Sequence, residues 1–439
     1  MRYSVILKGL PISQLQLEVQ RCGGKNLRVL LASKQVFCDL DDTNVTKLQL
    51  LGCSVNKVGG VQTVISPPVD VSPPTPLVGT PKYTPLELLG LAGLEDLRNL
   101  MAPPIYGEGF NLAIIDTGIR ESHSSIKGRV IYRKNYTSDV MRDDFNHGTG
   151  VCSIALSVAP LSNILNLKVL DKDGVGTEEE VALAIDDCIS LLTTNPSIAP
   201  HVINLSLGSL DDGNINNPIR VVCREAISQG IWVLASAGNL GPTNYSVTCP
   251  ACEEYVAAIG SIKYSPEENT FIISNFSSRG PTQEGLIKPD LVFFGEDIIM
   301  ASSVSDIATI AKSGTSFSTP IYSGVAIEYL EGMSRVGEIT WPDITDGAAI
   351  YPVLIQPVTE QEMLEEYLGL ICGRPEGVTG GKDYEYGYGM PYGPLVLQYL
   401  SPVGAVEDIS VIMSSFIPII GFAMILPVMK SMFQGKRTG

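Results

Sequence analysis

The first 66 residues alternate between apolar runs of strand length and amphipathic runs of helix length. These runs predict strands at 2–8, 27–32, 35–40 and 61–65, and helices at 12–21 and 45–51. The resulting order, βαββαβ, is that of the split βαβ unit of ferredoxin-like domains. We therefore expect residues 1–66 to form a small α+β domain.

A proline-rich stretch follows this unit. Residues 66–76 read SPPVDVSPPTP, and their prolines remove backbone donors and fix φ, which prevents a regular helix or sheet. We expect residues 67–84 to form an extended linker, and a second domain to begin at residue 85.

From residue 110 the pattern changes to short apolar runs that alternate with longer amphipathic ones. Strands are expected at 110–115, 164–170, 202–207, 231–235, 255–259 and 291–294, and helices at 147–157, 177–192, 219–229 and 319–332. Strands that are apolar on both faces and separated by helices predict a parallel sheet covered on both sides. We expect a doubly wound, mostly parallel α/β domain over residues 85–402, with its site at the carboxyl ends of the strands.

The C-terminal region holds one long apolar segment. Residues 409–429 are 21 residues without a formal charge, and Lys430, Lys436 and Arg437 follow them. This predicts a transmembrane helix in contact with membrane lipid, with the basic tail 430–439 on the cytoplasmic side and the main body outside. The apolar stretch within residues 1–8 is too short for a secretory signal, which favours the opposite side. The side of the membrane therefore stays open.

Composition narrows the possible functions. The chain has 439 residues, with 30 basic and 47 acidic side chains and a net charge of −17, so nucleic acid is not its expected partner. Its 44% of apolar residues exclude general disorder. Nine cysteines are too few for a disulfide scaffold, and their odd number leaves at least one unpaired within a monomer. The oligomeric state is not indicated.

Four polar residues stand where predicted strands end or predicted helices begin. Asp116 ends the run 111–115, Asn239 follows the run 235–238, and His147 and Ser316 each open a helix. Taken singly, each residue also fits a helix cap or a structural position. The helix start at Ser316 and the amide of Asn239 could both donate to an oxyanion.

Taken together, these segments resemble the subtilisin-like serine proteases, the subtilases, over residues 85 to about 400. The matching stretches are IDTGI at 115–119, NHGTGV at 146–151, NLSLG at 204–208, AGN at 237–239, FSSRGP at 276–281, KPD at 288–290, SGTS at 313–316 and GYG at 387–389. The order Asp, His, Ser is that known for subtilisin. The resemblance implies that Ser316 is the nucleophile, His147 the base and Asp116 its orienting partner, with Asn239 and the Ser316 amide as the oxyanion hole.

The resemblance also implies how a substrate binds. The segments Ser206-Leu207-Gly208 and Ala235-Ser236-Ala237-Gly238 resemble the two backbone segments that flank an extended protein or peptide substrate. Residues 1–66 resemble, more loosely, the inhibitory propeptide of the family; the alternative is a separate binding domain of the same architecture. The expected function is a membrane-tethered serine endopeptidase that processes its own N-terminal part. The alternative is a membrane-anchored pseudoprotease that binds peptides without turnover.

Three positions depart from the family pattern. Gly150 and Ile321 stand where histidines are common, and Phe293-Phe294-Gly295 stands where Ala-Pro-Gly is usual. None of these positions is a catalytic one.

No metal or other cofactor is expected from the sequence. Cys249 and Cys252 have the spacing of half a zinc site, but no second pair lies near them, so a short-loop disulfide or two free thiols are favoured. Calcium is common in the family, but we assign no calcium site.

Overall fold

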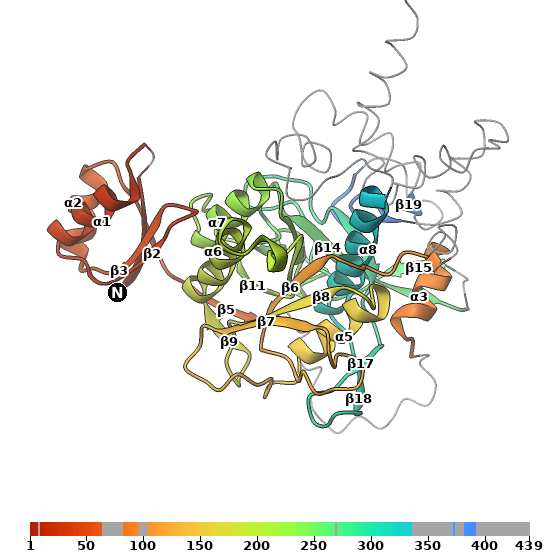
Figure 1. Ribbon diagram of the computed structural model, residues 1–439. Coiled ribbons are helices and arrows are strands. Elements are labelled where there is room, and N and C mark those ends of the chain that lie inside the picture. Colours follow the sequence, from red (N-terminus) through yellow and green to blue (C-terminus); the bar gives the residue numbers. More distant parts are fainter. Residues whose placement is uncertain are drawn as a thin grey trace, which may run out of the picture.

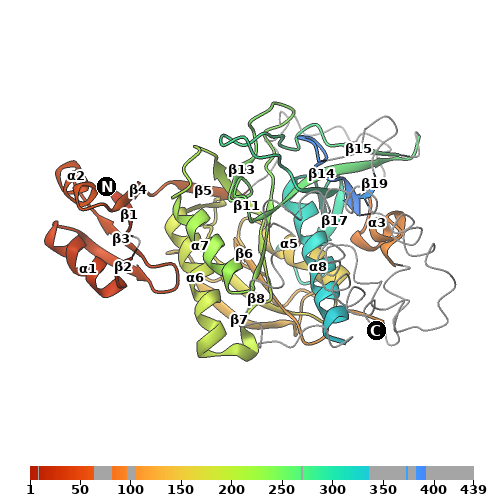
Figure 2. The same ribbon diagram turned by 90° about the horizontal axis from the view of Figure 1, so that it is seen from above.

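A computed structural model of the chain describes residues 1–7, 9–63, 82–95, 104–267, 270–335, 372–373 and 382–391. It places a small N-terminal unit beside a larger α/β domain (Figures 1 and 2). The expected linker up to residue 81, the expected membrane span 409–429 and the tail 430–439 lie outside the described residues. Among the helices that are described, none is long and apolar enough to cross a membrane.

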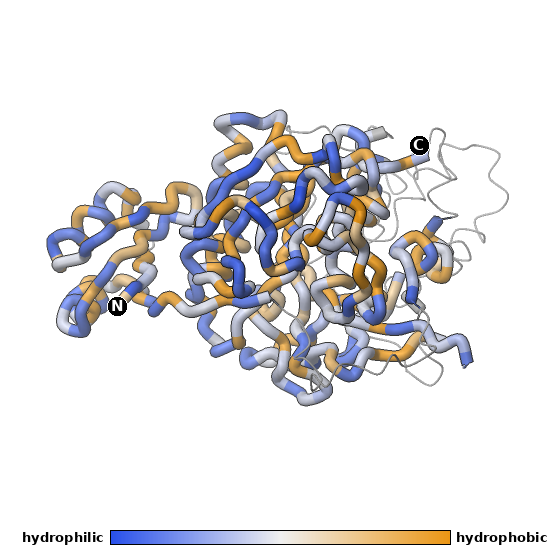
Figure 3. The backbone as a smooth tube through the Cα atoms, turned by 90° about the horizontal axis from the view of Figure 1, so that it is seen from below, coloured by the Kyte–Doolittle hydropathy of each residue, from blue (hydrophilic) through white to orange (hydrophobic). Residues whose placement is uncertain are grey.

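The N-terminal unit is an α+β sandwich. Its elements are β1 (Arg2–Ile6), α1 (Ile12–Arg21), β2 (Lys25–Leu30), β3 (Gln35–Asp39), α2 (Asp42–Leu50) and β4 (Ser54–Lys57). The four strands form one sheet in the order β2-β3-β1-β4. Both helices pack on one face of it through Leu15, Val19 and Leu48, which gives the unit a core of its own. Polar and apolar stretches accordingly alternate along this unit in Figure 3.

The last strand expected for this unit lies elsewhere. β4 takes the fourth place in the sheet, and the run expected at 61–65 forms β5 (Gly60–Thr63), which pairs with strands of the larger domain. The expectation was wrong because β4 is a mostly polar edge strand with one apolar residue, Val55, whereas β5 alternates exposed and buried residues in the usual way.

The larger domain is built on an eight-stranded sheet in the order β15-β14-β12-β10-β6-β8-β7, with β16 also beside β14. Its strands are β6 (Asn111–Asp116), β7 (Val130–Asn135), β8 (Asn163–Lys168), β10 (Val202–Leu205), β12 (Trp232–Ser236), β14 (Ala257–Ser265), β15 (Thr270–Ile273) and β16 (Leu291–Phe294). All neighbouring pairs are parallel except β14 and β15. The expected mostly parallel sheet is confirmed.

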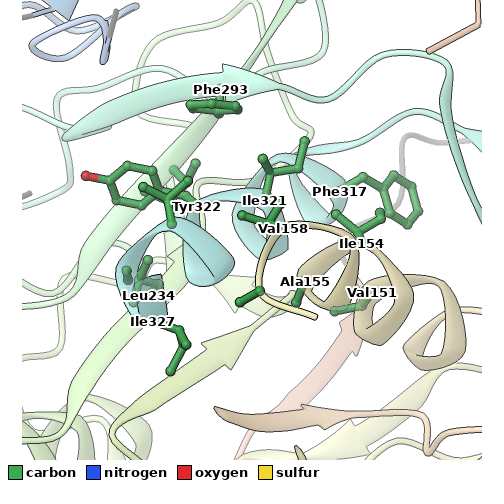
Figure 4. Close-up of a cluster of buried hydrophobic side chains, with 14 of the residues drawn as sticks. Val151, Ile154, Ala155, Val158, Leu234, Phe293, Phe317, Ile321, Tyr322 and Ile327 are labelled. Atoms are coloured by element: carbon green, nitrogen blue, oxygen red, sulfur yellow. The ribbon is translucent and has the colours of Figure 1, made fainter. Parts of the chain in front are cut away.

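Helices cover both faces of this sheet. They are α5 (Gly148–Val158), α6 (Glu178–Thr194), α7 (Pro218–Ser228) and α8 (Thr315–Arg335). Apolar side chains of α5 and α8 join the core on one face, and those of α6 and α7 join the core on the other. Figure 4 shows Val151 and Ile154 of α5 beside Phe317 and Ile321 of α8.

Shorter elements complete the domain. They are α3 (Pro85–Leu91), β9 (Val175–Thr177), a 3-10 turn at Pro196–Ile198, β11 (Leu207–Leu210), β13 (Thr248–Cys249), β17 (Ile298–Ala301), β18 (Thr309–Lys312), β19 (Cys372–Gly373) and β20 (Met390–Pro391). Thr84 caps α3 in a capping box with Glu87, and Tyr83 bridges to Ile298 of β17, so residues 83 and 84 are already attached to the larger domain.

The departures from the family pattern are absorbed by local packing. Phe293 and Phe294 are buried in β16, and the turn after them is held because Gly295 N donates to Ile262 O and Gly314 N donates to Gly295 O. Ile321 is fully buried in the core. At Gly150, a Cβ atom would lie 2.4 Å from Met300 Sδ, so the methionine fills the space that a side chain would need.

This packing predicts that the effect of Gly150→Ala on the free energy of unfolding changes sign when Met300 is replaced by alanine. Gly150→Ala should lower the free energy of unfolding by about 1 kcal/mol, because overpacking outweighs the gain in helix propensity. In a Met300→Ala background, the same change should raise that free energy by about 1 kcal/mol, because the clash is gone. Urea unfolding of the four proteins measures both effects, and equal signs in the two backgrounds would refute the interpretation.

Candidate active site

Asp116 and His147 form a buried hydrogen-bonded pair at the carboxyl edge of the sheet. Asp116 ends β6, and its Oδ1 and Oδ2 lie 2.8 and 3.0 Å from His147 Nδ1. Neither residue is exposed to solvent. The chain leaves the strand sharply, because Gly118 adopts φ +94° and Thr117 N donates to Asp116 Oδ1. This geometry selects the imidazole tautomer with its proton on Nδ1.

A second carboxylate, Asp143, ties the two chain segments together. Its Oδ1 accepts from Thr117 Oγ1 at 2.8 Å and from Asn146 N at 2.9 Å, and its Oδ2 accepts from Thr149 N at 2.9 Å. Asp143 therefore joins the turn after β6 to the first turn of α5. Our sequence analysis missed it, although an acidic residue four positions before the histidine was visible.

A buried lysine closes the other side of the turn after β6. Lys168 Nζ donates to Thr117 O at 2.6 Å and to Leu170 O at 2.8 Å. Burial lowers the pKa of this lysine, while the surrounding aspartates, Asp116 among them, oppose the shift. The turn that carries Asp116 is thus fixed by charged groups from two neighbouring segments.

Ser316 lies in the first turn of α8. Its Oγ donates to Ser206 O at 3.2 Å, and Ser206 Oγ donates back to Ser316 O at 2.9 Å. The ring of the next residue, Phe317, lies 5.4 Å from the His147 ring between centroids. His147 Nε2 is buried and has no hydrogen-bond partner in the described part of the chain. The helix start, the β10–β11 junction and the imidazole therefore meet at one place.

Asn239 is oriented by the residue before Ser316. Its Oδ1 accepts from Thr315 N and from Thr315 Oγ1, both at 2.9 Å, and these two donors identify the oxygen of the amide. The direction of Nδ2 is fixed as a result. Nδ2 and the Ser316 amide are the candidate donors to an oxyanion.

The chain's own β5 lies as an added strand beside the candidate site. On one side Thr63 and Gln62 face Leu207 and Gly208 of β11, next to Ser206. On the other side Gly60–Gln62 pair with β9, and Thr63 N donates to Gly174 O at 3.0 Å.

The second strand that flanks β5 is β9, whereas the segment 235–238, which we expect to flank a substrate, does not pair with β5. Ala235 and Ser236 pair inside the main sheet with β14 and are fully buried. Ala237 N donates to Ile259 O, and Gly238 packs on Thr248, where a Cβ atom would lie 2.8 Å from its Cγ2. The signal for β9 was present in the turn residues of DKDGVG at 171–176, between two apolar runs.

A pocket of about 380 Å³ lies between β5 and the loop after β12. Its lining includes Thr63, Val175, Gly208, Ser209, Leu210, Asn239, Leu240 and Thr248. No lining residue carries a charge. The pocket thus suits an uncharged side chain next to Asn239, and Leu240 and Thr248 are lining residues that our sequence analysis did not find.

Cys249 and Cys252 are free, buried thiols. Of the two expected possibilities, a short-loop disulfide or two free thiols, the structure favours the free thiols. Their mutual hydrogen bond and burial raise the pKa of Cys249. Within the described residues, no group of three or more His, Cys, Asp or Glu side chains is placed to hold a metal ion.

Comparison with known proteins agrees with this architecture. Residues 107–389 match the subtilase family, which is more than half of the chain. The chain therefore belongs to the subtilase family.

Individual relatives show the same similarity. The chain is 32% identical over 269 residues to "Serine protease AprX" of Bacillus subtilis, covering 54% of this chain and 60% of the relative. It is 33% identical over 226 residues to "Subtilase-type proteinase RRT12" of Saccharomyces cerevisiae, covering 50% and 43%. The chain thus spans about half the length of the curated relatives it matches.

Among solved structures, "Sphericase" superimposes with a TM-score of 0.52 at 22% identity, over 65% of this chain and 92% of that one. This likeness supports the fold.

Proposed function

We propose that the chain is a serine endopeptidase that uses Ser316, His147 and Asp116. The buried Asp116–His147 pair, with Nδ1 and Oδ1 at 2.8 Å, carries the proposal, because the imidazole lies beside Phe317, the residue that follows Ser316 in α8. Membership of the subtilase family supports the same chemistry. The substrates are proteins or peptides that bind in extended form between β11 and β9, as β5 does.

In the proposed reaction, Ser316 Oγ attacks the carbonyl carbon of the scissile bond and passes its proton to His147 Nε2. Asn239 Nδ2 and Ser316 N donate to the oxyanion that forms. His147 then gives the proton to the leaving amine, which leaves an acyl-enzyme on Ser316. A water molecule, deprotonated by His147, attacks the acyl-enzyme, and the proton returns to Ser316 Oγ as the acid product leaves. Asp116 holds the Nδ1 proton throughout and stabilises the imidazolium. The pocket beside Asn239 takes the side chain before the cut, which should be uncharged.

The alternative function is peptide binding without turnover. It would require the candidate groups to be present but unreactive, and labelling of Ser316 by a fluorophosphonate separates the two functions.

The proposed roles predict graded losses of activity. Ser316→Ala should abolish hydrolysis and labelling, because the nucleophile is gone. Asn239→Ala should lower kcat by a factor of about 10² to 10³ and leave measurable activity, because one of two oxyanion donors remains. Asn244→Ala, at an exposed asparagine, is the control. Steady-state kinetics with a peptide substrate measure the losses, and equal, total loss in the first two variants would contradict the division of roles.

We further propose that the N-terminal unit is an inhibitor that the enzyme itself cuts off. Backbone amides of the unit are bound by carboxylates of α6: Gly59 N donates to Glu178 at 2.7 Å and Ser33 N donates to Asp186 at 3.1 Å. Arg2 makes two hydrogen bonds to Glu179, at 2.6 and 2.7 Å. Leu30 and Phe37 are buried in the same core as the α6 and α7 side chains. This contact supports long residence of β5 in the cleft.

The register of β5 indicates where the cut falls. Thr63 faces Leu207, so an antiparallel strand extended by one residue would bring residue 64 opposite Ser206. Ser206 O is the acceptor of Ser316 Oγ. We therefore propose cleavage after residue 64, just before the proline-rich stretch 66–76.

Self-processing predicts a mass difference between two chains. Wild type should lose a fragment of residues 1–64, while Ser316→Ala made in the same host should keep its full mass. The two fragments should remain associated at first, because the interface with α6 survives the cut. Intact-mass analysis decides this, and if wild type hydrolyses peptides yet keeps its full mass, the N-terminal unit is a permanent domain.

We also propose that the enzyme is tethered to a membrane by residues 409–429, on the strength of their 21 uncharged residues. The basic tail favours a catalytic domain on the extracytoplasmic side. A membrane-impermeant fluorophosphonate should then label Ser316 equally in intact and permeabilised cells. Labelling only after permeabilisation would place the domain on the other side. Recovery in the soluble fraction of a labelled chain that still contains residues 409–429 would contradict the tether.

A further inference from the structure

The residue before His147 adopts an uncommon backbone conformation. Asn146 has φ +63°, in the left-handed region, which a residue other than glycine occupies at some cost. Such a conformation persists where the surrounding contacts determine it. The contacts of Asn146 therefore show what fixes the backbone from which His147 projects.

Those contacts come from two sides. On one side Asn146 N donates to Asp143 Oδ1 at 2.9 Å. On the other side the β17–β18 hairpin donates to both oxygens of Asn146. Ser303 N and Ser302 Oγ donate to Oδ1 at 2.7 and 3.0 Å, and Lys312 Nζ donates to the main-chain oxygen at 2.6 Å.

Lys312 has a special place among these donors. It is the last residue of β18, four residues before Ser316, and its ammonium group binds the residue directly before His147. One side chain thus connects the segment that leads to the nucleophile with the loop that carries the base. We propose that Lys312 is a positioning residue that fixes the distance between Ser316 and His147 and keeps a positive charge beside the Asp116–His147 pair. The inference rests on the proposed peptidase function.

The charges around this site are few and identifiable. Burial lowers the pKa of Lys312. The negative charges of Asp143 and Asp116 oppose this shift and so favour the ammonium form. From β8, Lys168 is the second cation. The aspartates in the surroundings of Lys168 are Asp116, Asp139, Asp143 and Asp144. From α8, the group next to the imidazole is the uncharged ring of Phe317.

Two separate effects of Lys312 on the reaction follow. Proton transfer requires Ser316 Oγ to reach His147 Nε2, and a misplacement of about 1 Å can cost about a hundredfold in rate. Loss of the contact to Asn146 should therefore lower kcat with little change in KM. Loss of the cation should favour the protonated imidazole, because less positive charge remains near it. The acid limb of the rate profile should then move to higher pH.

The test compares Lys312→Met and Lys312→Arg with Lys127→Met, which removes one positive charge from an exposed loop. Active sites are counted with a fluorophosphonate, and kcat and KM per active site are measured from about pH 5 to about 9. Lys312→Met should lower kcat at least tenfold, leave KM within about twofold and move the acid limb to higher pH. Lys312→Arg, which keeps donor and charge, should restore the position of the acid limb and most of kcat.

Several outcomes would overturn the inference. One is a Lys312→Met protein whose kcat and pH profile equal those of Lys127→Met. Another is a lower melting temperature and fewer active sites with unchanged kcat per site, which would show a purely structural role. If Lys312→Met does not fold, Lys312→Gln removes the charge with a smaller change of polarity, and an unshifted acid limb in that variant refutes the electrostatic part. Failure of wild type to react with the fluorophosphonate would instead refute the peptidase function itself.

Discussion

The buried hydrogen bond between Asp116 and His147 is the constraint that the rest of the site depends on. A carboxylate without solvent access is costly unless donors surround it, and here an imidazole and a backbone amide supply them. Both partners must then be held by rigid elements, because a small separation would leave a buried charge without a partner. The parallel sheet supplies one position at the end of β6, and the packing of α5 against α8 supplies the other. The same packing places Ser316, so one core positions all three groups.

The sequence predicted the framework of this arrangement well, for physical reasons. Buried strands such as 291–294 and amphipathic helices such as 12–21 carry their periodicity locally, and both were found with their observed bounds. Asp116, His147, Asn239 and Ser316 drew attention because each stands where such an element ends or begins, and their catalytic roles stay predictions from the family resemblance. Their mutual geometry is tertiary, and the sequence indicated it only through resemblance to the family.

What the sequence did not reveal depends on contacts between distant segments. β4 and β9 are short strands with one apolar residue each, so the pattern of apolar positions does not mark them as strands. The destination of β5 could not be predicted, because its alternation of buried and exposed residues fits either sheet. Asp143 and Lys312 are charged residues in loops or at strand ends, where a solvated side chain is the ordinary expectation. The compensation between Gly150 and Met300 joins positions 150 residues apart, which no local pattern links.

The position of β5 has a consequence for the energetics of the domain. β5 lies between β9 and β11 and pairs with both. Its departure would therefore leave two strand edges with unpaired backbone donors and acceptors. Their hydrogen bonds would pass to water or to whichever extended chain is present, including a strand from another molecule. Through mass action, the thermal stability of such a domain would vary with the concentration of peptide around it. Without β5 the cleft would be an incomplete sheet. The stability of that sheet would depend on the extended chains in the solution as well as on the domain's own sequence.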